Sequence, residues 1–187
     1  ANGGSFSSAR YVDGVKAKRQ AGSTLKPFLY EMAIERNLLT ASSILDDSSI
    51  NVSTPAGLYV PQDYDNEFKG HVSVRTALSA SLNIPAVRTL MLVGPDSFIS
   101  RLKQLGIEDL NEGDYYGLSL ALGTADVTLY ELVNAYRTLA NNGKSSELKI
   151  NPDKKNVKKQ ILKKEAVFIV SDILSDRTAR SITFGFE

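Results

Sequence analysis

The chain has 187 residues, of which 42% are hydrophobic and 23% charged. This balance is typical of a globular protein and is enough for one domain with a sizeable core, or for one lobe of a larger domain. A net charge of +1 implies no polyanion partner, so nucleic-acid binding is not indicated. The absence of cysteine excludes thiol catalysis, cysteine metal sites and disulfides. Because His71 is the single histidine, a Ser-His-Asp triad is possible only if His71 is its histidine.

The hydrophobic pattern predicts a chain made mainly of helices, after a polar loop over residues 1–18. Apolar residues at three- and four-residue spacing predict helices over residues 24–36, 74–80, 85–93, 95–105, 128–141 and 162–174. Short strands are predicted at residues 58–60 and 147–150, and a turn at residues 46–49. On the helix over residues 128–141, the apolar residues that share one face are Leu129, Leu132, Val133, Tyr136, Leu139 and Ala140. No apolar run approaches the ~18 residues of a membrane span, and no signal peptide is visible.

A serine and a lysine, Ser23 and Lys26, lie three residues apart at the start of the first predicted helix. Gly22 allows the chain to turn sharply before them, and Pro27 falls in the first turn, where its missing N–H has little effect. Residues three apart share a helix face, so Ser23 and Lys26 can touch. A lysine whose pKa is lowered by burial can take the proton of a serine, and the helix N-terminus favours the oxyanion that follows attack. Taken alone, however, a Ser-x-x-Lys spacing occurs often by chance, and a helix N-cap is then the favoured interpretation of Ser23.

A second polar group lies between the second and third predicted helices. Pro85 disfavours the α region at Ile84 and suits the first position of a new helix. Residues 81–84 are therefore predicted to form a break between two helices.

Within this break, Ser81 and Asn83 can project to the same side, because alternate residues of an extended segment do so. We expect both to lie in an inter-helix loop that faces Ser23 and Lys26. The expected separation of the Ser81 hydroxyl from the Lys26 amine is below ~10 Å, which a direct or water-bridged contact requires. Judged without the first motif, the two residues fit a helix cap and a loop hydrogen bond better than a catalytic site.

Together these motifs resemble the transpeptidase domain of class A, or bifunctional, penicillin-binding proteins, most closely the 1C type. Residues 19–28 resemble the family pattern R-Q-P-G-S-T-x-K-P-F, which contains the Ser-x-x-Lys signature. Residues 59–87 resemble the family segment through S-x-N, and residues 117–136 resemble its L-A-L-G stretch with the helix that follows. The departures are Ala21 in place of Pro, Asp63 in place of Asn and His71 in place of Pro.

The resemblance implies an α+β protein with the transpeptidase fold shared by penicillin-binding proteins and β-lactamases, here mainly the helical lobe with much of the sheet missing. The third family motif, K-T-G, is absent, so residues 1–187 are expected to be a partial transpeptidase domain with K-T-G shortly after residue 187. The glycosyltransferase domain and membrane anchor of the parent type are not in this chain. We expect a membrane-anchored parent on the extracytoplasmic (periplasmic) face of the bacterial inner membrane, and slow acylation of residues 1–187 on their own.

The resemblance also implies a function, that of a serine D,D-transpeptidase. Such an enzyme cross-links peptidoglycan stem peptides that end in D-Ala–D-Ala through an acyl-enzyme, and β-lactams acylate it. Ser23 would be the nucleophile, Lys26 the base and Ser81 a proton relay. Asn83 would bind the substrate amide and help to hold Lys26. No cofactor and no metal are implied.

Two alternatives stay open on the same fold: a serine β-lactamase, and a β-lactam-binding sensor or other non-catalytic module. A β-lactamase needs a group that activates water against the acyl-enzyme. Glu131 and Asn134 resemble the Glu-x-x-Leu-Asn deacylation motif of class A β-lactamases, but their spacing differs and we assign them no chemistry. A sensor would keep the Ser-x-x-Lys pair, so the sequence separates it poorly from a transpeptidase.

Overall fold

The structure, a computed structural model, describes residues 12–54, 57–61, 67–148 and 157–185. The helices of this part are η1 (Gly22–Leu25, 3₁₀), α1 (Lys26–Glu35), α2 (Val74–Ser79), α3 (Asn83–Val93), α4 (Pro95–Gln104), α5 (Gly113–Tyr116), η2 (Gly117–Leu122, 3₁₀), α6 (Leu129–Ala140), α7 (Lys164–Ser175) and α8 (Ser181–Phe184). The strands form four antiparallel two-stranded ladders: β1 (Arg19–Gln20) with β6 (Asp126–Val127), β2 (Ile44–Asp47) with β5 (Gly70–Ser73), β3 (Val52–Thr54) with β4 (Gly57–Tyr59), and β7 (Lys144–Ser145) with β8 (Lys159–Gln160). The predicted mainly helical α+β character is confirmed.

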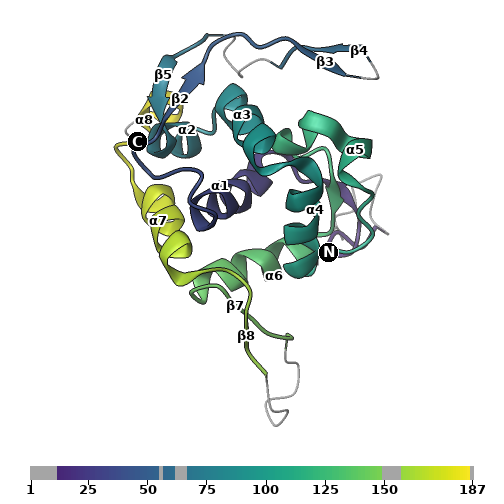
Figure 1. The fold of residues 1–187 in the computed structure, drawn as a ribbon. Helices are drawn as coiled ribbons and strands as arrows, with labels where there is room; N and C mark the ends of the chain where they lie inside the picture. The colour runs from purple at the N-terminus through teal and green to yellow at the C-terminus, as the bar shows by residue number, and fades with distance from the viewer. Residues whose placement is uncertain (1–11, 55–56, 62–66, 149–156, 186–187) are drawn as a thin grey trace, which may run out of the picture.

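Helix α1 forms the centre of the molecule. Its first nine residues, from Lys26 to Ile34, are all buried, including the polar side chains of Lys26 and Glu31. Helices α2, α3, α4 and α7 and the 3₁₀ helix η2 pack against it, and Figure 1 shows α1 surrounded by them. The start of α1 is therefore held at a fixed place in the core, which matters because Ser23 directly precedes it.

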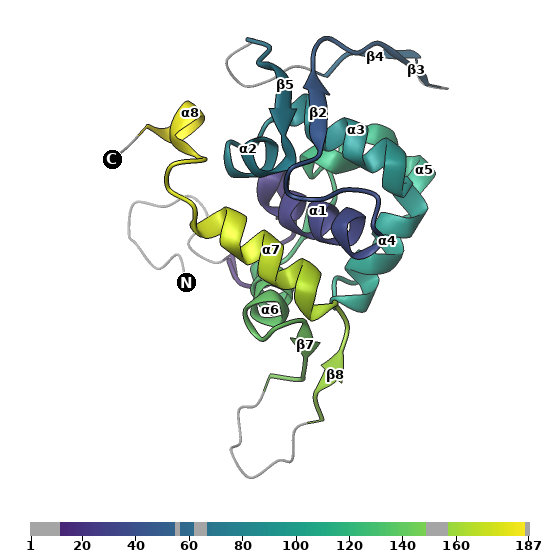
Figure 2. The ribbon, with the colours of Figure 1, turned by 60° about the vertical axis from the view of Figure 1, so that its left-hand side comes forward.

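Three of the ladders lie outside this helical core. The β2–β5 and β3–β4 ladders follow one another above α3, and the β7–β8 ladder projects beyond α6 and α7 (Figures 1 and 2). The predicted turn at residues 46–49 is wrong, because Asp46 and Asp47 end strand β2. Asp47 is fully buried and accepts a hydrogen bond from the Lys69 N–H at 2.8 Å. This tertiary contact overrides the local preference of acidic residues for turns.

The predicted strand near residue 147 is also misplaced. Strand β7 covers Lys144–Ser145 and pairs with β8, residues 147 and 148 are not in a strand, and residues 149–150 lie outside the described ranges. The predicted strand at residues 58–60 corresponds to β4.

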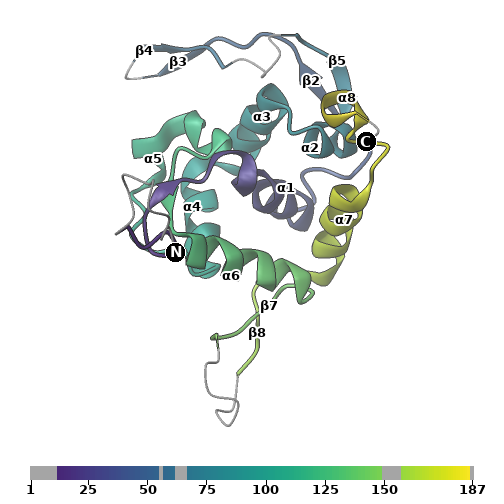
Figure 3. The same cartoon turned by 180° about the vertical axis from the view of Figure 1, so that it is seen from behind.

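The apolar face predicted for α6 is buried only in part. Ala135, Thr138 and Leu139 are buried, whereas Leu129 and Val133 are more than half exposed. Figure 3 shows α6 at the edge of the helical core, where only one side meets other helices. Its amphipathic pattern predicts the helix correctly but not which of its apolar residues are covered.

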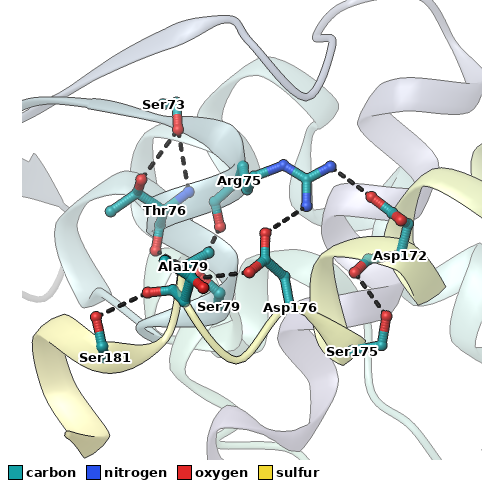
Figure 4. Close-up of polar contacts among 10 residues, drawn as sticks. Ser73, Arg75, Thr76, Ser79, Asp172, Ser175, Asp176, Ala179 and Ser181 are labelled. Atoms are coloured by element: carbon teal, nitrogen blue, oxygen red, sulfur yellow. Dashed lines mark hydrogen bonds and ion pairs between the residues drawn. The ribbon is translucent and has the colours of Figure 1, made fainter. Parts of the chain in front are cut away.

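Arg75 of α2 connects that helix to the C-terminal end of α7. Its guanidinium donates to Asp176 at 2.9 Å and to Asp172 at 2.5 Å (Figure 4). The second oxygen of Asp176 accepts the Ala179 N–H at 3.0 Å, which orders the connection to α8. These two ion pairs attach α7 to α2, the helix whose C-terminal end leads to Ser81.

A buried cluster of charges joins α1 to α4 and α7. Arg101 of α4 is 6% exposed and donates to Glu31 at 3.1 Å and to both oxygens of Glu35 at 2.7 and 3.1 Å. Burial raises the pKa of Glu31 to about 8, despite the opposing effect of Arg101. Burial also acts to raise the pKa of Glu35, but hydrogen bonds from Arg101 and from the Lys163 N–H outweigh it and hold this pKa at about 2. Near neutral pH the ion pair is therefore Arg101 with Glu35, and Glu31 is protonated.

Glu31 is expected to make the free energy of unfolding decrease as the pH rises from 4.5 to about 8. Across this interval the folded protein keeps a proton that an unfolded glutamate, with a pKa of 4.5, has lost. The stabilisation is complete below pH 4.5 and is lost by pH 8, with a slope on the order of 1 kcal/mol per pH unit. Glu31→Gln keeps the hydrogen-bonding shape without the titration, so urea unfolding of this variant should show a flatter pH dependence. An unchanged slope would contradict the assignment.

No helix in the described ranges is both long enough and apolar enough to cross a membrane.

Candidate active site

The first motif forms a tight turn at the entrance to the buried helix. Gly22, the first residue of η1, has a φ of +59°, which glycine adopts without steric cost. The Lys26 N–H donates to the Ser23 carbonyl, so the two residues are one 3₁₀ turn apart. Side chains three residues apart in a 3₁₀ helix lie on the same side. The structure therefore places an exposed Ser23 directly above a buried Lys26.

Lys26 connects the first motif to the second. Its side chain is 1% exposed, and its Nζ donates to the Ser81 carbonyl at 2.6 Å, to Asn83 Oδ1 at 2.7 Å and to Ser81 Oγ at 3.3 Å. These partners lie 55 and 57 residues further along the chain. The predicted proximity of the Ser81 hydroxyl to the Lys26 amine is thus confirmed. A buried amine requires such hydrogen bonds, because a polar or charged group without partners is costly in the interior.

Ser81 lies at the C-terminal end of α2 in an unusual backbone conformation. Its N–H donates to the Leu78 carbonyl at 3.1 Å, and the Leu82 N–H donates to the Ala77 carbonyl at 3.0 Å. This is the Schellman arrangement, in which the left-handed residue is most often glycine. Ser81 adopts the left-handed conformation, with a φ of +57°, at a cost of roughly 1 kcal/mol. That conformation turns both its carbonyl and its hydroxyl toward Lys26.

The simple capping interpretation of Ser81 is therefore wrong. The N-cap residue of α3 is Leu82, and no side chain caps that helix. The expectation that Asn83 lies in a loop is also corrected, because α3 begins at Asn83 and Pro85 is its third residue. A proline there is tolerated, since the first four N–H groups of a helix have no intrahelical acceptor. Asn83 thus presents its side chain to Lys26 from the first position of a helix.

Tyr136 of α6 fastens the turn from another side. Its hydroxyl donates to the Thr24 carbonyl at 2.9 Å, and its ring contacts the Phe28 ring edge to face, with 5.0 Å between centroids. Sequence reasoning places Tyr136 on the apolar face of its helix and misses this polar role. An aromatic residue on a half-buried face carries no local signal for the partner of its hydroxyl.

Glu131 and Asn134, the residues that resemble a deacylation motif, have structural roles. Glu131 Oε2 accepts the Thr128 N–H at 2.8 Å, and Thr128 Oγ1 accepts the Glu131 N–H at 3.1 Å. This is a capping box, and the Thr-x-x-Glu spacing in the sequence is its signal. The other Glu131 oxygen accepts the Glu108 N–H at 2.9 Å. Asn134 Oδ1 accepts from Arg137 on the same helix.

The single histidine, His71, lies exposed in β5, where its Cα pairs with that of Asp46. Within the part of the chain that the structure describes, no group of three or more acidic or histidine side chains could hold a metal ion.

Comparison with solved structures identifies the fold. A crystal structure of penicillin-binding protein 1A from Haemophilus influenzae superposes with a TM-score of 0.79 at 24% sequence identity, over 90% of this chain and 31% of that one. A peptidoglycan glycosyltransferase from Burkholderia ambifaria superposes with a TM-score of 0.75 at 17% identity, over 88% of this chain and 58% of that one. The chain thus has the α+β fold of these proteins.

Sequence comparison then gives the family. The family described as penicillin binding protein transpeptidase domain matches residues 5–183. Penicillin-binding protein 1C of Escherichia coli (strain K12) is 35% identical over 167 residues, which are 89% of this chain and 21% of that protein. Penicillin-binding protein 1A of Rickettsia felis is 33% identical over 144 residues, 76% of this chain and 18% of that protein. The chain belongs to the penicillin-binding protein transpeptidase family, and it spans about a fifth of the length of these curated relatives.

Proposed function

We propose that this chain carries the acylation site of a serine D,D-transpeptidase that cross-links peptidoglycan stem peptides and is acylated by β-lactams. The observation that carries the proposal is the set of hydrogen bonds from buried Lys26 to Ser81 and Asn83, one helical turn below exposed Ser23. Family membership supports the same reaction class. By analogy with the class A parent type, we place the protein on the extracytoplasmic face of the inner membrane, in the periplasm, with a membrane anchor outside residues 1–187.

The base in this proposal is a neutral Lys26. A neutral amine has two N–H groups and one lone pair. The Ser81 carbonyl and Asn83 Oδ1 can only accept hydrogen bonds, so they take up the two N–H groups. The lone pair is then left for a hydroxyl group, either that of Ser23 or that of Ser81. In this neutral state the 3.3 Å contact with the Ser81 hydroxyl would reverse, so that the hydroxyl donates to the amine, or the lone pair would accept the proton of Ser23 instead.

The reaction follows from this arrangement. Ser23 Oγ attacks the carbonyl carbon of the penultimate D-Ala while its proton moves to Lys26. The C–N bond then breaks, and the proton passes through the Ser81 hydroxyl to the departing D-Ala amine. Asn83 holds the substrate amide and keeps Lys26 in place. An amine of a second stem peptide attacks the ester, which forms the cross-link and restores Ser23. A β-lactam enters the same first step, but its leaving group stays attached.

The backbone N–H of Ser23 supplies one oxyanion donor in this proposal. The second donor and the clamp for the substrate carboxylate come from a K-T-G strand outside residues 1–187. Experiments on acylation therefore use the intact protein.

The test is mass spectrometry after incubation of the intact protein with benzylpenicillin. We expect a mass increase of one whole β-lactam on the tryptic peptide over residues 20–36, since trypsin cleaves after Arg19 and Arg36 but not between Lys26 and Pro27. Fragmentation should place the label on Ser23 rather than Thr24. Heat-unfolded protein should stay unlabelled, because the amine of Lys26 is then no longer held. A label on another peptide, or none, would refute the proposal.

The same experiment separates the alternatives. A label that disappears within seconds indicates a β-lactamase, whereas a transpeptidase holds it for a long time. Both oxygens of Glu131 accept backbone N–H groups, which argues against that residue as an activator of water. A sensor would be labelled stably but would not transfer the acyl group of a D-Ala–D-Ala peptide to an added amine.

A further inference from the structure

Gly123, which follows η2, lies in direct backbone contact with the residue before the nucleophile. Gly123 has a φ of +78° and a ψ of 40°, the left-handed conformation that favours glycine. A Cβ atom added to it would lie 1.9 Å from the Gly22 carbonyl oxygen and 2.4 Å from the Gly22 carbonyl carbon and nitrogen. A side chain at position 123 therefore cannot coexist with the present position of Gly22.

This contact lies at the end of a backbone ladder. The β1–β6 pairing, in which Gln20 faces Asp126, continues with an Ala21 N–H to Ala125 carbonyl bond at 3.0 Å. A further bond of 2.9 Å runs from the Gly22 N–H to the Gly123 carbonyl. At Gly22 the chain turns out of the ladder, with its φ of +59°.

The next amide along the chain is that of Ser23. No hydrogen bond between the described residues uses it. The ladder thus pairs the two preceding N–H groups and leaves the N–H of Ser23 available to a ligand.

The peptide bond explains how Gly123 acts on that amide. The carbonyl of Gly22 and the N–H of Ser23 belong to one rigid planar unit, with the C=O and N–H on opposite sides. An added Cβ at position 123 would lie closest to the oxygen of this unit and would also be too close to its carbon. A side chain at position 123 would therefore force this unit to move, and the Ser23 N–H would move with it.

We propose that Gly123 is a positioning residue for acylation: its lack of a side chain lets the Gly22–Ser23 peptide plane point the Ser23 N–H at the developing oxyanion. The inference rests on the proposed function, in which this N–H is an oxyanion donor. Loss of one such donor typically slows acyl transfer ~100- to 1,000-fold. Gly123 touches neither substrate nor Ser23 Oγ in this account and acts only through the backbone of Gly22.

The test compares Gly123→Ala with Gly106→Ala in the intact protein. Gly106 also has a positive φ, +89°, and ends α4 in a Schellman arrangement, but a Cβ there meets only the Asn134 side chain at an ordinary 3.5 Å. Both substitutions carry the same kind of backbone strain, of roughly 1–2 kcal/mol. We expect the rate constant of acylation by penicillin to fall at least about tenfold in Gly123→Ala, with little change in the preceding binding constant. In Gly106→Ala both constants should change less than about threefold.

A spectroscopic measurement distinguishes positioning from a general structural effect. Hydrogen bonds from an oxyanion hole lower the carbonyl stretching frequency of the ester in the acyl-enzyme. The infrared band of the ester on Ser23 should therefore shift to higher frequency in Gly123→Ala and stay in place in Gly106→Ala.

Asparagine variants keep the test decisive if Gly123→Ala folds poorly. Asparagine tolerates the left-handed conformation better than alanine does but has the same Cβ. Gly123→Asn should therefore lose acylation while folded, and Gly106→Asn should not. The proposal is overturned if folded Gly123 variants react like the Gly106 variants, or if both Gly123 variants unfold while both Gly106 variants fold. Absence of Ser23 labelling in the wild-type protein would instead refute the proposed function itself.

Discussion

Methionine in place of Lys26 is expected to slow the acylation of Ser23 by β-lactams by roughly 100- to 10,000-fold, the usual contribution of a general base. Methionine has a similar length but neither a lone pair of amine basicity nor an N–H to donate. Ser23 would keep its proton, and the Ser81 carbonyl and Asn83 Oδ1 would lose the hydrogen bonds that Lys26 gives them. The second-order rate constant of labelling by fluorescent penicillin, measured at neutral pH, checks this result.

Arginine at the same position separates proton transfer from packing. Lys26→Arg keeps N–H donors in the buried site, but a guanidinium does not release its proton in proteins and so cannot act as a base. It should therefore acylate as slowly as Lys26→Met. Ser23→Ala defines zero labelling, and Lys103→Met, which alters an exposed lysine of α4, should leave the rate unchanged. An arginine variant within about tenfold of the wild-type rate would show that Lys26 is not the base.

Of the substitutions considered for this protein, removal of the Arg101 guanidinium is expected to lower the free energy of unfolding most. Arg101→Met leaves the Glu35 carboxylate without its bidentate partner and leaves Glu31, which is fully buried, without a donor. Breaking a buried pair in this way typically lowers the free energy of unfolding by about 3–5 kcal/mol. For a chain of this size, that corresponds to a decrease in melting temperature on the order of 10 °C. Urea unfolding near neutral pH measures the change directly.

A double-mutant cycle tests whether the loss comes from the unpaired carboxylate. Adding Glu35→Gln to Arg101→Met should recover part of the stability, because no charge is then left without its partner. Arg177→Met, at an exposed position after α7, should change the free energy of unfolding by less than about 0.5 kcal/mol. If the two single substitutions at Arg101 and Glu35 simply add, the ion pair does not hold α1 against α4.

The helices could be predicted because their signals are local. The spacing of apolar residues predicts α1, α2, α4, α6 and α7, each within about three residues of the observed ends, and the side chain of Ser73 caps α2. Strands were harder to place, because these strands are two to four residues long and depend on distant partners. Strand β2 is the clearest case: Asp46 and Asp47 favour a turn locally, but pairing with β5 decides their conformation.

The candidate site likewise has features that the sequence predicts and features that depend on the tertiary structure. The sequence by itself determined which residues can meet: Ser23 and Lys26 through their three-residue spacing, and Ser81 and Asn83 through the helix break that Pro85 marks. Only the tertiary structure decided how they meet. Ser81 faces Lys26 because the end of α2 forces it into a left-handed conformation, and Gly123 fixes the backbone before Ser23 from a hundred residues away. The physical reason is the sequence separation over which each interaction acts. Periodicity and capping act within a few residues, whereas the partners of the buried Lys26 amine and of the Gly123 backbone are set by the packing of the whole chain.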